Sequence, residues 1–347
     1  MAGTKPKSGP TMHDVAAAAG VSQATVSLVL NSASGSRFSE DTRRRVQDAV
    51  DRLGYRTNAH AKVLRGGVAG MIGFVGDFVA SSPFAGRIIE AAQDRAWESG
   101  LLLLTVNTGG DRALEAASLE TMLSYKVAGV VYASMYHQLL DVPEVLGEVP
   151  SVVLNSEDRD GRFCSVAPDE EEGGYTATRH LIAAGHTRIA LINNDVLESG
   201  LPAAVGRFAG YSRAMQEHGL EVNPDFVRFG HGAEPDGFEH ATSLLTAACR
   251  PTAIFCGTDR MAWGAYQAAA TLGFSIPSDL SIVGFDNQET LAPHLRPALT
   301  TLELPFEAMG RRAVDLVLQG TEPEGRVELM ECPLIERNSV THPKEMP

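Results

Sequence analysis

Cysteine is scarce in this sequence, and it contains no long apolar run. The 347 residues include four cysteines, and no two of them form a Cys-x-x-Cys pair. This argues against a disulfide framework and favours buried, reduced thiols, as in the cytoplasm. No apolar run approaches the ~18 residues of a membrane-spanning helix, and the N-terminus lacks the apolar core of a signal peptide. We therefore expect a cytoplasmic protein with no membrane partner.

Signatures of catalysis and of metal binding are also missing. The sequence contains no His-Glu-x-x-His, no Gly-x-Ser-x-Gly, no phosphate-binding loop ending in Gly-Lys-Ser/Thr and no Gly-x-Gly-x-x-Gly after a strand. Its ten histidines show no spacing typical of metal ligands. Paired carboxylates such as Asp259 and Asp286 could perform acid–base chemistry, which is the argument for an enzyme. We expect a protein that is not an enzyme, with no catalytic residue, no metal and no cofactor.

Positive charge is in short supply overall, but it is concentrated near the N-terminus. The formal net charge is −14, yet residues 1–67 carry ten basic and five acidic side chains, a net charge of +5. The remaining residues carry 19 basic and 38 acidic side chains, a net charge of −19. A basic segment joined to an acidic one indicates a small polyanion-binding module attached to a domain with another task.

Residues 11–31 are predicted to form two short helices joined by a tight turn. Thr11 and Asp14 have the spacing of a capping box, Gly20 favours the left-handed conformation that ends a helix, and Ser22 is expected to cap the second helix. One side of the second helix would pack on a small core. The other side carries small or hydrogen-bonding residues, as a surface that enters the DNA major groove requires: Gln23, Ala24, Thr25, Ser27, Leu28 and Asn31. A generic helical hairpin is the alternative interpretation.

Further segments complete this N-terminal module. Residues 1–10 are polar and are expected to form a mobile tail. Ser39 is expected to cap a third helix. Residues 55–67 are either a plain linker or a segment that folds only against DNA and a second copy, with Asn58 as a helix cap and Leu64 as an apolar wedge between base steps.

From residue 70 onward, short apolar strands alternate with longer helices. Strands are predicted near 71–76, 101–106, 128–132, 151–154, 188–192, 225–229, 252–256 and 280–284. Helices are predicted near 85–99, 112–125, 170–184, 205–218, 237–248, 260–272 and 306–319. This alternation predicts parallel sheets in two Rossmann-like lobes, with a ligand cleft at the carboxyl ends of the strands. The side chains expected at these ends are Asn107, Asn155, Asn193, Thr258 and Asp286.

Several stretches, in a fixed order along nearly the whole chain, carry a family resemblance. They include VAAAAGVSQATVSLVLN, RLGYRTNA and AKVLRGG, then IGFVGD, KVAGVVYAS, GRFAGYSRAM, PTAIFCGTDRMAWGAY, LSIVGFDN and LTTLELP. In order and spacing they resemble the LacI/GalR family of bacterial transcriptional regulators. The resemblance implies an α/β protein with an all-α helix-turn-helix head and a hinge helix, followed by two lobes of the periplasmic-binding-protein type I.

Four regions are predicted on this basis. They are a disordered tail at 1–10, a helix-turn-helix DNA-binding domain at 11–57, a hinge helix and linker at 58–67, and an effector-binding domain at 68–347. Within the last, lobe 1 would comprise about 70–168 and 302–328, and lobe 2 about 169–300 and 329–342.

Position by position, the resemblance implies a set of DNA contacts. Gln23, Ala24 and Leu28 match base-reading positions; adenine would suit the Gln23 amide, and thymine methyls would suit Ala24 and Leu28. The remaining residues implied or expected to contact DNA are Thr11, Ser22, Thr25, Ser27, Asn31, Tyr55, Asn58, Leu64 and Arg65. The sequence departs from the family at Leu28, where many members have a basic or polar residue. It also departs at Thr57, where proline is common, and at Lys62–Val63, where Arg–Ser is common.

The resemblance likewise implies residues that bind a ligand in the cleft. Arg207 and Asp286 match the ligand-binding arginine and aspartate, and Thr258 falls where sugar-binding members often have asparagine. Phe84 and Asn155 match first-lobe positions that face the ligand. An arginine, carboxylates and an aromatic ring suit polyhydroxylated or weakly anionic ligands.

Two residues near the predicted cleft are given other roles. Asp259 is expected to be structural, as a cap on the helix that starts there. His231 is expected to be a solvated loop residue, with a place at the mouth of the cleft as the alternative.

The function expected is that of a ligand-responsive transcriptional regulator, most often a repressor, that binds palindromic double-stranded operator DNA. A small molecule in the cleft, a sugar or a sugar derivative, would change the DNA affinity. Because the C-terminal residues contain no heptad segment, a homodimer is favoured over a tetramer. The alternatives are a cytoplasmic small-molecule-binding protein and a regulator controlled by a protein corepressor. A transport binding protein would need a signal peptide and no basic head.

Overall fold

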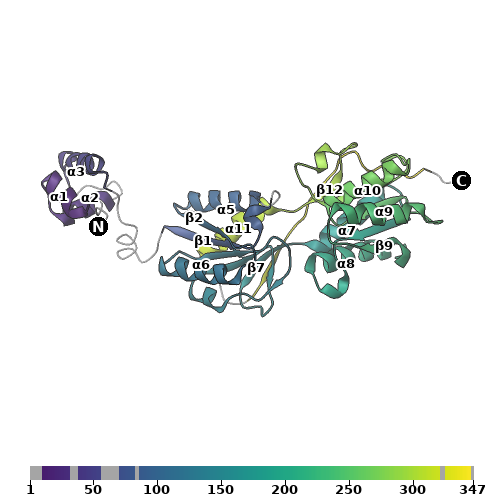
Figure 1. The fold of residues 1–347 in the computed structure, drawn as a ribbon, viewed down its shortest axis with the longest axis horizontal. Helices are drawn as coiled ribbons and strands as arrows, with labels where there is room; N and C mark the ends of the chain where they lie inside the picture. The colour runs from purple at the N-terminus through teal and green to yellow at the C-terminus, as the bar shows by residue number, and fades with distance from the viewer. Residues whose placement is uncertain (1–9, 32–37, 56–69, 83–85, 321–324, 345–347) are drawn as a thin grey trace, which may run out of the picture. The chain divides into compact units, whose positions relative to one another are not determined.

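The computed structural model describes residues 10–31, 38–55, 70–82, 86–320 and 325–344. The chain divides into two compact units, one before Gly70 and one from Gly70 onward, which we call the head and the body (Figure 1). No helix among the described residues is long and apolar enough to span a membrane. The predicted hinge residues Asn58, Leu64 and Arg65 lie outside the described residues, as does Phe84.

The described part of the head contains helices α1 (Met12–Ala19), α2 (Gln23–Asn31) and α3 (Glu40–Leu53). A capping box begins α1: the Thr11 hydroxyl accepts from the Asp14 amide at 3.3 Å, and the Asp14 carboxylate accepts from the Thr11 amide at 2.7 Å. The helix ends at Gly20, whose φ of 65° is left-handed. The predicted beginning and end of this helix are confirmed.

Serine hydroxyls cap the other two helices of the head, as predicted. The Ser22 hydroxyl accepts from the Thr25 amide at 3.1 Å, and the Ser39 hydroxyl accepts from the Thr42 amide at 3.2 Å. Each cap of this kind stabilises the fold by about 1 kcal/mol. The three helices enclose a small core of buried side chains: Val15, Ala16, Ala19, Val26, Val46 and Ala49.

Two six-stranded sheets define two lobes in the body. Lobe 1 contains β1 (Met71–Gly76), β2 (Leu102–Asn107), β3 (Val130–Ala133), β5 (Ser151–Leu154), β7 (Cys164–Pro168) and β13 (Val327–Met330), in the order β13-β7-β5-β3-β1-β2. Lobe 2 contains β8 (Ile189–Asn193), β9 (Val227–Phe229), β10 (Ala253–Cys256), β11 (Ser281–Asp286), β12 (Thr300–Glu303) and β14 (Leu334–Ile335), in the order β14-β12-β11-β10-β8-β9. Neighbouring strands are parallel in both sheets except for β12 and β14.

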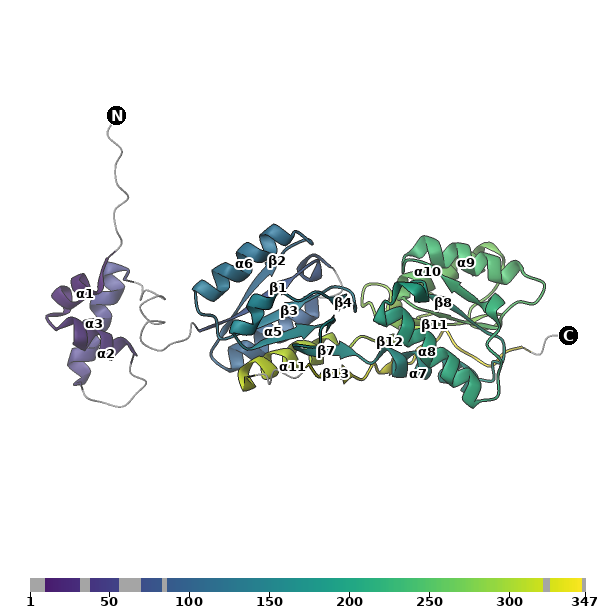
Figure 2. The same cartoon turned by 90° about the horizontal axis from the view of Figure 1, so that it is seen from below.

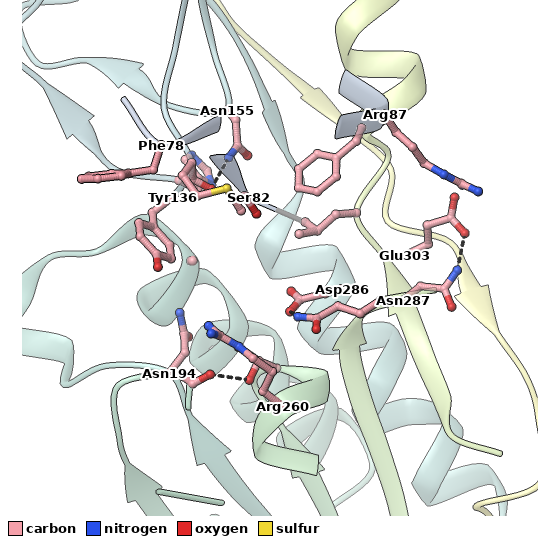
Figure 3. A pocket seen from close by; sticks show the side chains of 18 of the residues that line it. Phe78, Ser82, Arg87, Tyr136, Asn155, Asn194, Arg260, Asp286, Asn287 and Glu303 are labelled. Carbon is pink, nitrogen blue, oxygen red and sulfur yellow. Dashed lines mark hydrogen bonds between the residues drawn. The ribbon is translucent and has the colours of Figure 1, made fainter. Parts of the chain in front are cut away.

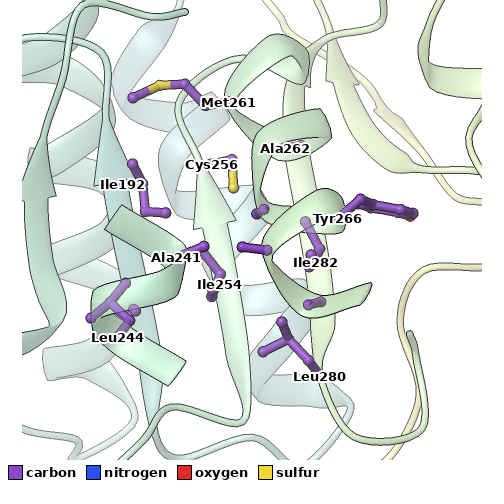
Figure 4. Packing of buried hydrophobic residues seen from close by; sticks show 14 of the residues in the cluster. Ile192, Ala241, Leu244, Ile254, Cys256, Met261, Ala262, Tyr266, Leu280 and Ile282 are labelled. Atoms are coloured by element: carbon purple, nitrogen blue, oxygen red, sulfur yellow. The ribbon is translucent and has the colours of Figure 1, made fainter. Parts of the chain in front are cut away.

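Helices cover both faces of each sheet (Figure 2). In lobe 1, α5 (Gly86–Glu98) and α11 (Phe306–Gln319) pack on one face and α6 (Arg112–Ser124) on the other. In lobe 2, α7 (Glu170–Ala183) and α8 (Pro202–Glu217) pack on one face, and α9 (Glu234–Thr246) and α10 (Asp259–Thr271) on the other. Figure 4 shows the second of these layers, where isoleucines of β8, β10 and β11 contact alanines and leucines of the two helices.

The predicted alternation of strands and helices is confirmed, with bounds within a few residues of those expected. Four strands of the two sheets are absent from the sequence-based prediction: β7, β12, β13 and β14. They are short or rich in polar residues, and they flank the points where the chain passes between lobes. The chain therefore leaves the sheet of lobe 2 after Glu303, leaves the sheet of lobe 1 after Met330 and returns to lobe 2 at β14.

None of the four cysteines, all of which lie among the described residues, forms a disulfide. Cys256 and Cys332 are buried, and burial raises the pKa of both thiols. Cys164 is half-buried, and Cys249 is exposed. The expectation of buried thiols is therefore wrong for Cys249, because it follows the last turn of α9 at the surface of the body.

Candidate functional sites

The open face of α2 is the first candidate site. Gln23 and Ala24 are exposed, Leu28 is 50% exposed and Thr25 is half-buried. Ser27 is only 7% exposed, so the prediction that it lies on the open face is wrong. Ser27 lies three positions before Leu30, which packs against the core of the head, and residues three apart lie on the same side of a helix. The open face is therefore narrower than predicted.

Other predicted DNA-binding residues of the head have structural roles. Thr11 and Ser22 are the exposed caps of α1 and α2, and the Ser22 hydroxyl also lies 2.9 Å from the Thr25 hydroxyl. Tyr55 is half-buried and packs against the core of the head. Asn31 is the last residue of α2. Thr11, Ser22 and Tyr55 therefore stabilise the head whether or not they also contact DNA.

His13 is a neighbour of the open face that the sequence-based prediction missed. One of its ring nitrogens, Nδ1, lies 3.0 Å from Nε2 of Gln23. With Nδ1 as the acceptor, the Gln23 amide nitrogen donates to it, and the amide is held in one orientation. No local pattern indicates this contact, because His13 lies in the first turn of α1 and the tight turn joins the other end of α1 to Gln23.

The second candidate site is a cavity of about 790 Å³ in the body, lined by residues of both lobes (Figure 3). Four of the predicted ligand-binding residues line it: Asn155, Arg207, Thr258 and Asp286. They come from loops after β5 and β10, from the end of β11 and from α8. The structure therefore brings together four residues that are spread over more than one hundred positions of the sequence.

Arg207 is buried beneath this cavity and is already paired. Its Nε donates to Oε2 of Glu170 at 2.8 Å, its Nη1 donates to the Gly257 carbonyl oxygen, and its guanidinium lies 3.8 Å from the centre of the Phe285 ring. Burial disfavours the charge of Arg207, but the carboxylate of Glu170 outweighs this and raises the pKa of the arginine. Arg207 therefore stabilises the folded body through these contacts and also lines the cavity.

Glu170, the first residue of α7, accepts from a second cation. Nδ1 of His137, in lobe 1, lies 3.3 Å from Oε1 of Glu170, and Nε2 of His137 lies 3.1 Å from Oε1 of Glu157. Burial alone would lower the pKa of His137, but the two carboxylates raise it to about 9. At neutral pH the protonated imidazole therefore links lobe 1 to the buried carboxylate that holds Arg207.

Asp286 lies at the end of β11 with its backbone in the left-handed region, at φ 112°. Burial raises the pKa of its carboxyl to about 6, although the charge of Arg207 acts in the opposite direction. Gln288 donates from Nε2 to its carboxylate at 3.0 Å. A strained backbone and an incompletely compensated buried carboxylate are features that cluster at functional sites.

Thr258 has the capping role that was expected of Asp259, and it also lines the cavity. The Thr258 hydroxyl, not Asp259, caps α10 by accepting from the Met261 amide at 3.1 Å. The prediction of Asp259 as the cap is wrong because its carboxylate turns inward and accepts from the Gln288 amide at 2.7 Å and the Thr301 hydroxyl at 2.6 Å. Burial and then the nearby Asp286 raise the pKa of the Asp259 carboxyl well above its usual value.

Several cavity residues are missing from the sequence-based prediction. They are polar or aromatic and include Phe78, Tyr136, Asn194, Arg260 and Gln288. Asn194 directly follows the predicted strand-end residue Asn193, and Arg260 lies two positions after Thr258, which is the one signal that could have indicated them. His231 is exposed, as expected, but it also lines the cavity, which was the alternative for it.

Comparison with known proteins bears on both sites. A family model described as bacterial regulatory proteins of the lacI family matches residues 11–58, and one described as a periplasmic binding protein-like domain matches residues 178–340. The HTH-type transcriptional repressor PurR of Vibrio campbellii is 32% identical over 336 residues, which cover 95% of this chain and 98% of that protein. The chain belongs to the LacI family. The predicted family and the predicted fold class are confirmed.

Further members of the LacI family are similar over most of their length. The HTH-type transcriptional regulator DegA of Bacillus subtilis is 34% identical over 304 residues, which cover 86% of this chain and 88% of that protein. The crystal structure of the lac repressor dimer bound to operator and an anti-inducer superposes with a TM-score of 0.81 at 27% identity, covering 96% of this chain and all of that one. A complex of the regulator CelR with cellobiose gives a TM-score of 0.66 at 29% identity, covering 95% of this chain and 99% of that one.

Proposed function

We propose that this LacI-family protein is a sequence-specific DNA-binding transcriptional regulator, most often acting as a repressor, whose DNA affinity changes when a small molecule occupies the cavity of the body. The observation that carries the proposal is the pairing, in one chain, of an open uncharged α2 face with a cavity lined by residues of two lobes. Its named relatives are transcriptional repressors and regulators, which supports the same role.

Base recognition is assigned to the open face of α2. The Gln23 amide can donate to adenine N7 and accept from adenine N6, while Ala24 and Leu28 can contact thymine methyl groups. Thr25 and Thr11 would contact phosphates, and the predicted hinge residues would bind the minor groove and bend the site. The basic charge of the N-terminal residues would supply the non-specific, salt-dependent part of the affinity.

Effector control is assigned to the cavity of the body. A polyhydroxylated ligand, a sugar or a sugar derivative, would donate to Asp286 and contact both lobes at once, and the cellobiose complex of CelR is an example of such a ligand in a similar protein. Only a difference in ligand affinity between two arrangements of the lobes can change the DNA affinity. A ligand that stabilised the body without changing DNA binding would favour control by a protein corepressor instead.

Assembly as a homodimer is part of the proposal, because two heads are needed for the two halves of a palindrome. The edge strand β2 exposes Leu102 and Leu104, and Trp97 of the neighbouring α5 is 67% exposed. Apolar side chains gathered at a sheet edge favour burial against a second copy. Sedimentation equilibrium should therefore report a dimer, and a monomer at micromolar concentration would contradict this part of the proposal.

Replacing Gln23 with alanine should weaken binding at one base pair of each half-site by about 1–3 kcal/mol, because two hydrogen bonds to one base are lost. The measurement is a fluorescence-anisotropy titration of DNA selected from a random library, repeated with each base pair substituted. The matched control is Gln47→Ala, which removes an exposed glutamine from α3 and leaves α2 intact. A uniform loss of affinity on all sequences would show that Gln23 does not read a base.

Replacing His13 with alanine should reduce the same discrimination by about 0.5–1.5 kcal/mol, the usual contribution of one hydrogen bond. The variant keeps the Gln23 side chain but frees its amide to rotate, so the lost selectivity should lie at the base pair that Gln23→Ala identifies. Binding of unrelated DNA should change little. If the selectivity were lost at a different base pair, His13 would be a direct contact and not a positioning residue.

A further inference from the structure

The three arginines that line the cavity of the body differ in how they are paired. Arg207 is paired with Glu170, and Arg87 forms an ion pair with Glu289. Arg260, the second residue of α10, forms no ion pair with any residue that the structure describes, and its Nε is buried without a hydrogen-bond partner. A guanidinium is always charged and offers five hydrogen-bond donors in a planar fork. The charge of Arg260 is therefore available to bind a ligand in the cavity.

Two acceptors of residues that line the same cavity are also without partners. Oδ1 of Asn194 and Oε1 of Gln288 are buried and make no hydrogen bond, and Gln288 is only 5% exposed. Both residues line the same cavity as Arg260. Buried polar groups are paired in nearly all proteins, so a donor and two acceptors left open around one cavity indicate a missing binding partner. Figure 3 shows Asn194 and Arg260 on one wall of the cavity, with Glu303 on the far side.

Building on the proposed effector role of the cavity, we infer that the ligand is a polyhydroxylated molecule that carries an anionic group, a carboxylate or a phosphate. The anionic group is bound by Arg260, and hydroxyl groups of the ligand donate to Asn194, Gln288 and Asp286. Arg260 lies in the first turn of the 13-residue helix α10, where the helix dipole adds to the positive potential.

The alternative, a neutral ligand, would leave the charge of Arg260 without an ion pair in a closed cavity. Closing the cavity around a neutral sugar would remove water from Arg260, whose charge lowers the pKa of Asp286 but forms no ion pair among the described residues, and this desolvation is costly. An anionic group satisfies the guanidinium with charge-assisted hydrogen bonds, which are about twice as strong as neutral ones. The Glu303 end of the cavity cannot take this group, because its carboxylate already accepts from Asn287 at 2.7 Å and would repel an anion.

The inference is tested by thermal denaturation of the full chain with three sets of probes. The first set is neutral aldoses, disaccharides and polyols; the second is the matching aldonates, uronates and sugar phosphates; the third is inorganic phosphate alone. We expect stabilisation by members of the second set, and the ranking of carboxylates against phosphates then identifies which anion is bound. Inorganic phosphate should give a weaker stabilisation at millimolar concentration.

The deciding variant is Arg260→Gln, which keeps hydrogen-bond donors and removes the charge. It should weaken binding of the best anionic probe by about tenfold or more, whereas Arg260→Lys should weaken it less. The matched control is Arg213→Gln, an arginine of the body that does not line the cavity and is paired with Glu171 and Glu172, and it should change the affinity by less than about threefold.

The possible failures separate this inference from the function on which it rests. Stabilisation by neutral probes alone, unchanged in Arg260→Gln, would overturn the inference and leave effector control standing. An anionic probe that binds through Arg260 but does not alter DNA affinity would support the inference and contradict effector control. If no probe in any set stabilised the protein, the inference would be overturned. The DNA-binding role of the head would not be affected, because it is tested by a separate DNA titration.

Discussion

Replacing Arg207 with methionine should lower the free energy of unfolding of the body by about 3–5 kcal/mol, because the buried carboxylate of Glu170 would lose its main counter-charge. Glu170 is buried, and Arg207 lowers the pKa of its carboxyl against the opposing effect of burial. His137 would remain as the one partner of the carboxylate among the described residues. The measurement is urea denaturation followed by tryptophan fluorescence, since both tryptophans, Trp97 and Trp263, lie in the body.

The control for this experiment is on the same helix. Arg213 also lies in α8 and also pairs with carboxylates, those of Glu171 and Glu172, but these pairs are partly exposed. Arg213→Met should therefore cost no more than about 1 kcal/mol. Equal losses of unfolding free energy in the two variants would contradict this prediction. They would mean that burial of the Arg207–Glu170 pair does not increase its contribution to stability.

Replacing Asp286 with asparagine should make the body more stable at neutral pH and at the same time insensitive to its ligand. The pKa of Asp286 is about 6 in the folded body, against 3.8 for a free carboxyl. Because folding raises the pKa of Asp286, its protonated side chain stabilises the folded body below about pH 4. This stabilisation is lost as the pH rises through 6 and the carboxyl ionises. At pH 7 the ionised carboxylate costs about 3 kcal/mol, which asparagine would avoid while still accepting from Gln288.

The stability gain of Asp286→Asn should therefore be small at pH 4 and largest above pH 7, as measured by urea denaturation across this range. DNA binding by the variant should be normal, but compounds that change the DNA affinity of the unsubstituted protein should have no effect on it. The control is Asp279→Asn, since Lys344 and the Ser275 amide lower the pKa of that exposed carboxyl, and no gain is expected there. A variant that still responds fully to ligand would remove Asp286 from the binding site.

Local features of the structure could be predicted from the sequence because they depend on neighbours in the chain. The caps at Thr11, Ser22 and Ser39 need residues only three positions apart, and the strand–helix alternation of the body follows from apolar runs of four to six residues. The strands β7 and β12 were harder to predict, because each carries polar residues that only pairing within the lobe sheets makes compatible with burial.

The chemistry of the cavity depends on contacts that no local pattern contains. Glu170 is 33 positions from His137 and 37 from Arg207, and nothing between them in the sequence indicates that the three form one buried network. The resemblance indicated Arg207 as the ligand-binding arginine. That it is already paired, and that Arg260 is not, could be seen only once the lobes had brought their side chains together.

The most direct test of the account is whether the full chain distinguishes one DNA sequence from others. DNA selected from a random library and a scrambled duplex of the same composition should be titrated at the same salt concentration, near 0.15 M. We expect an inverted repeat to be selected and to be bound about 10³-fold or more tightly than the scrambled duplex. Equal affinity for the two duplexes, or no enriched sequence, would contradict the claim that this chain is a sequence-specific regulator.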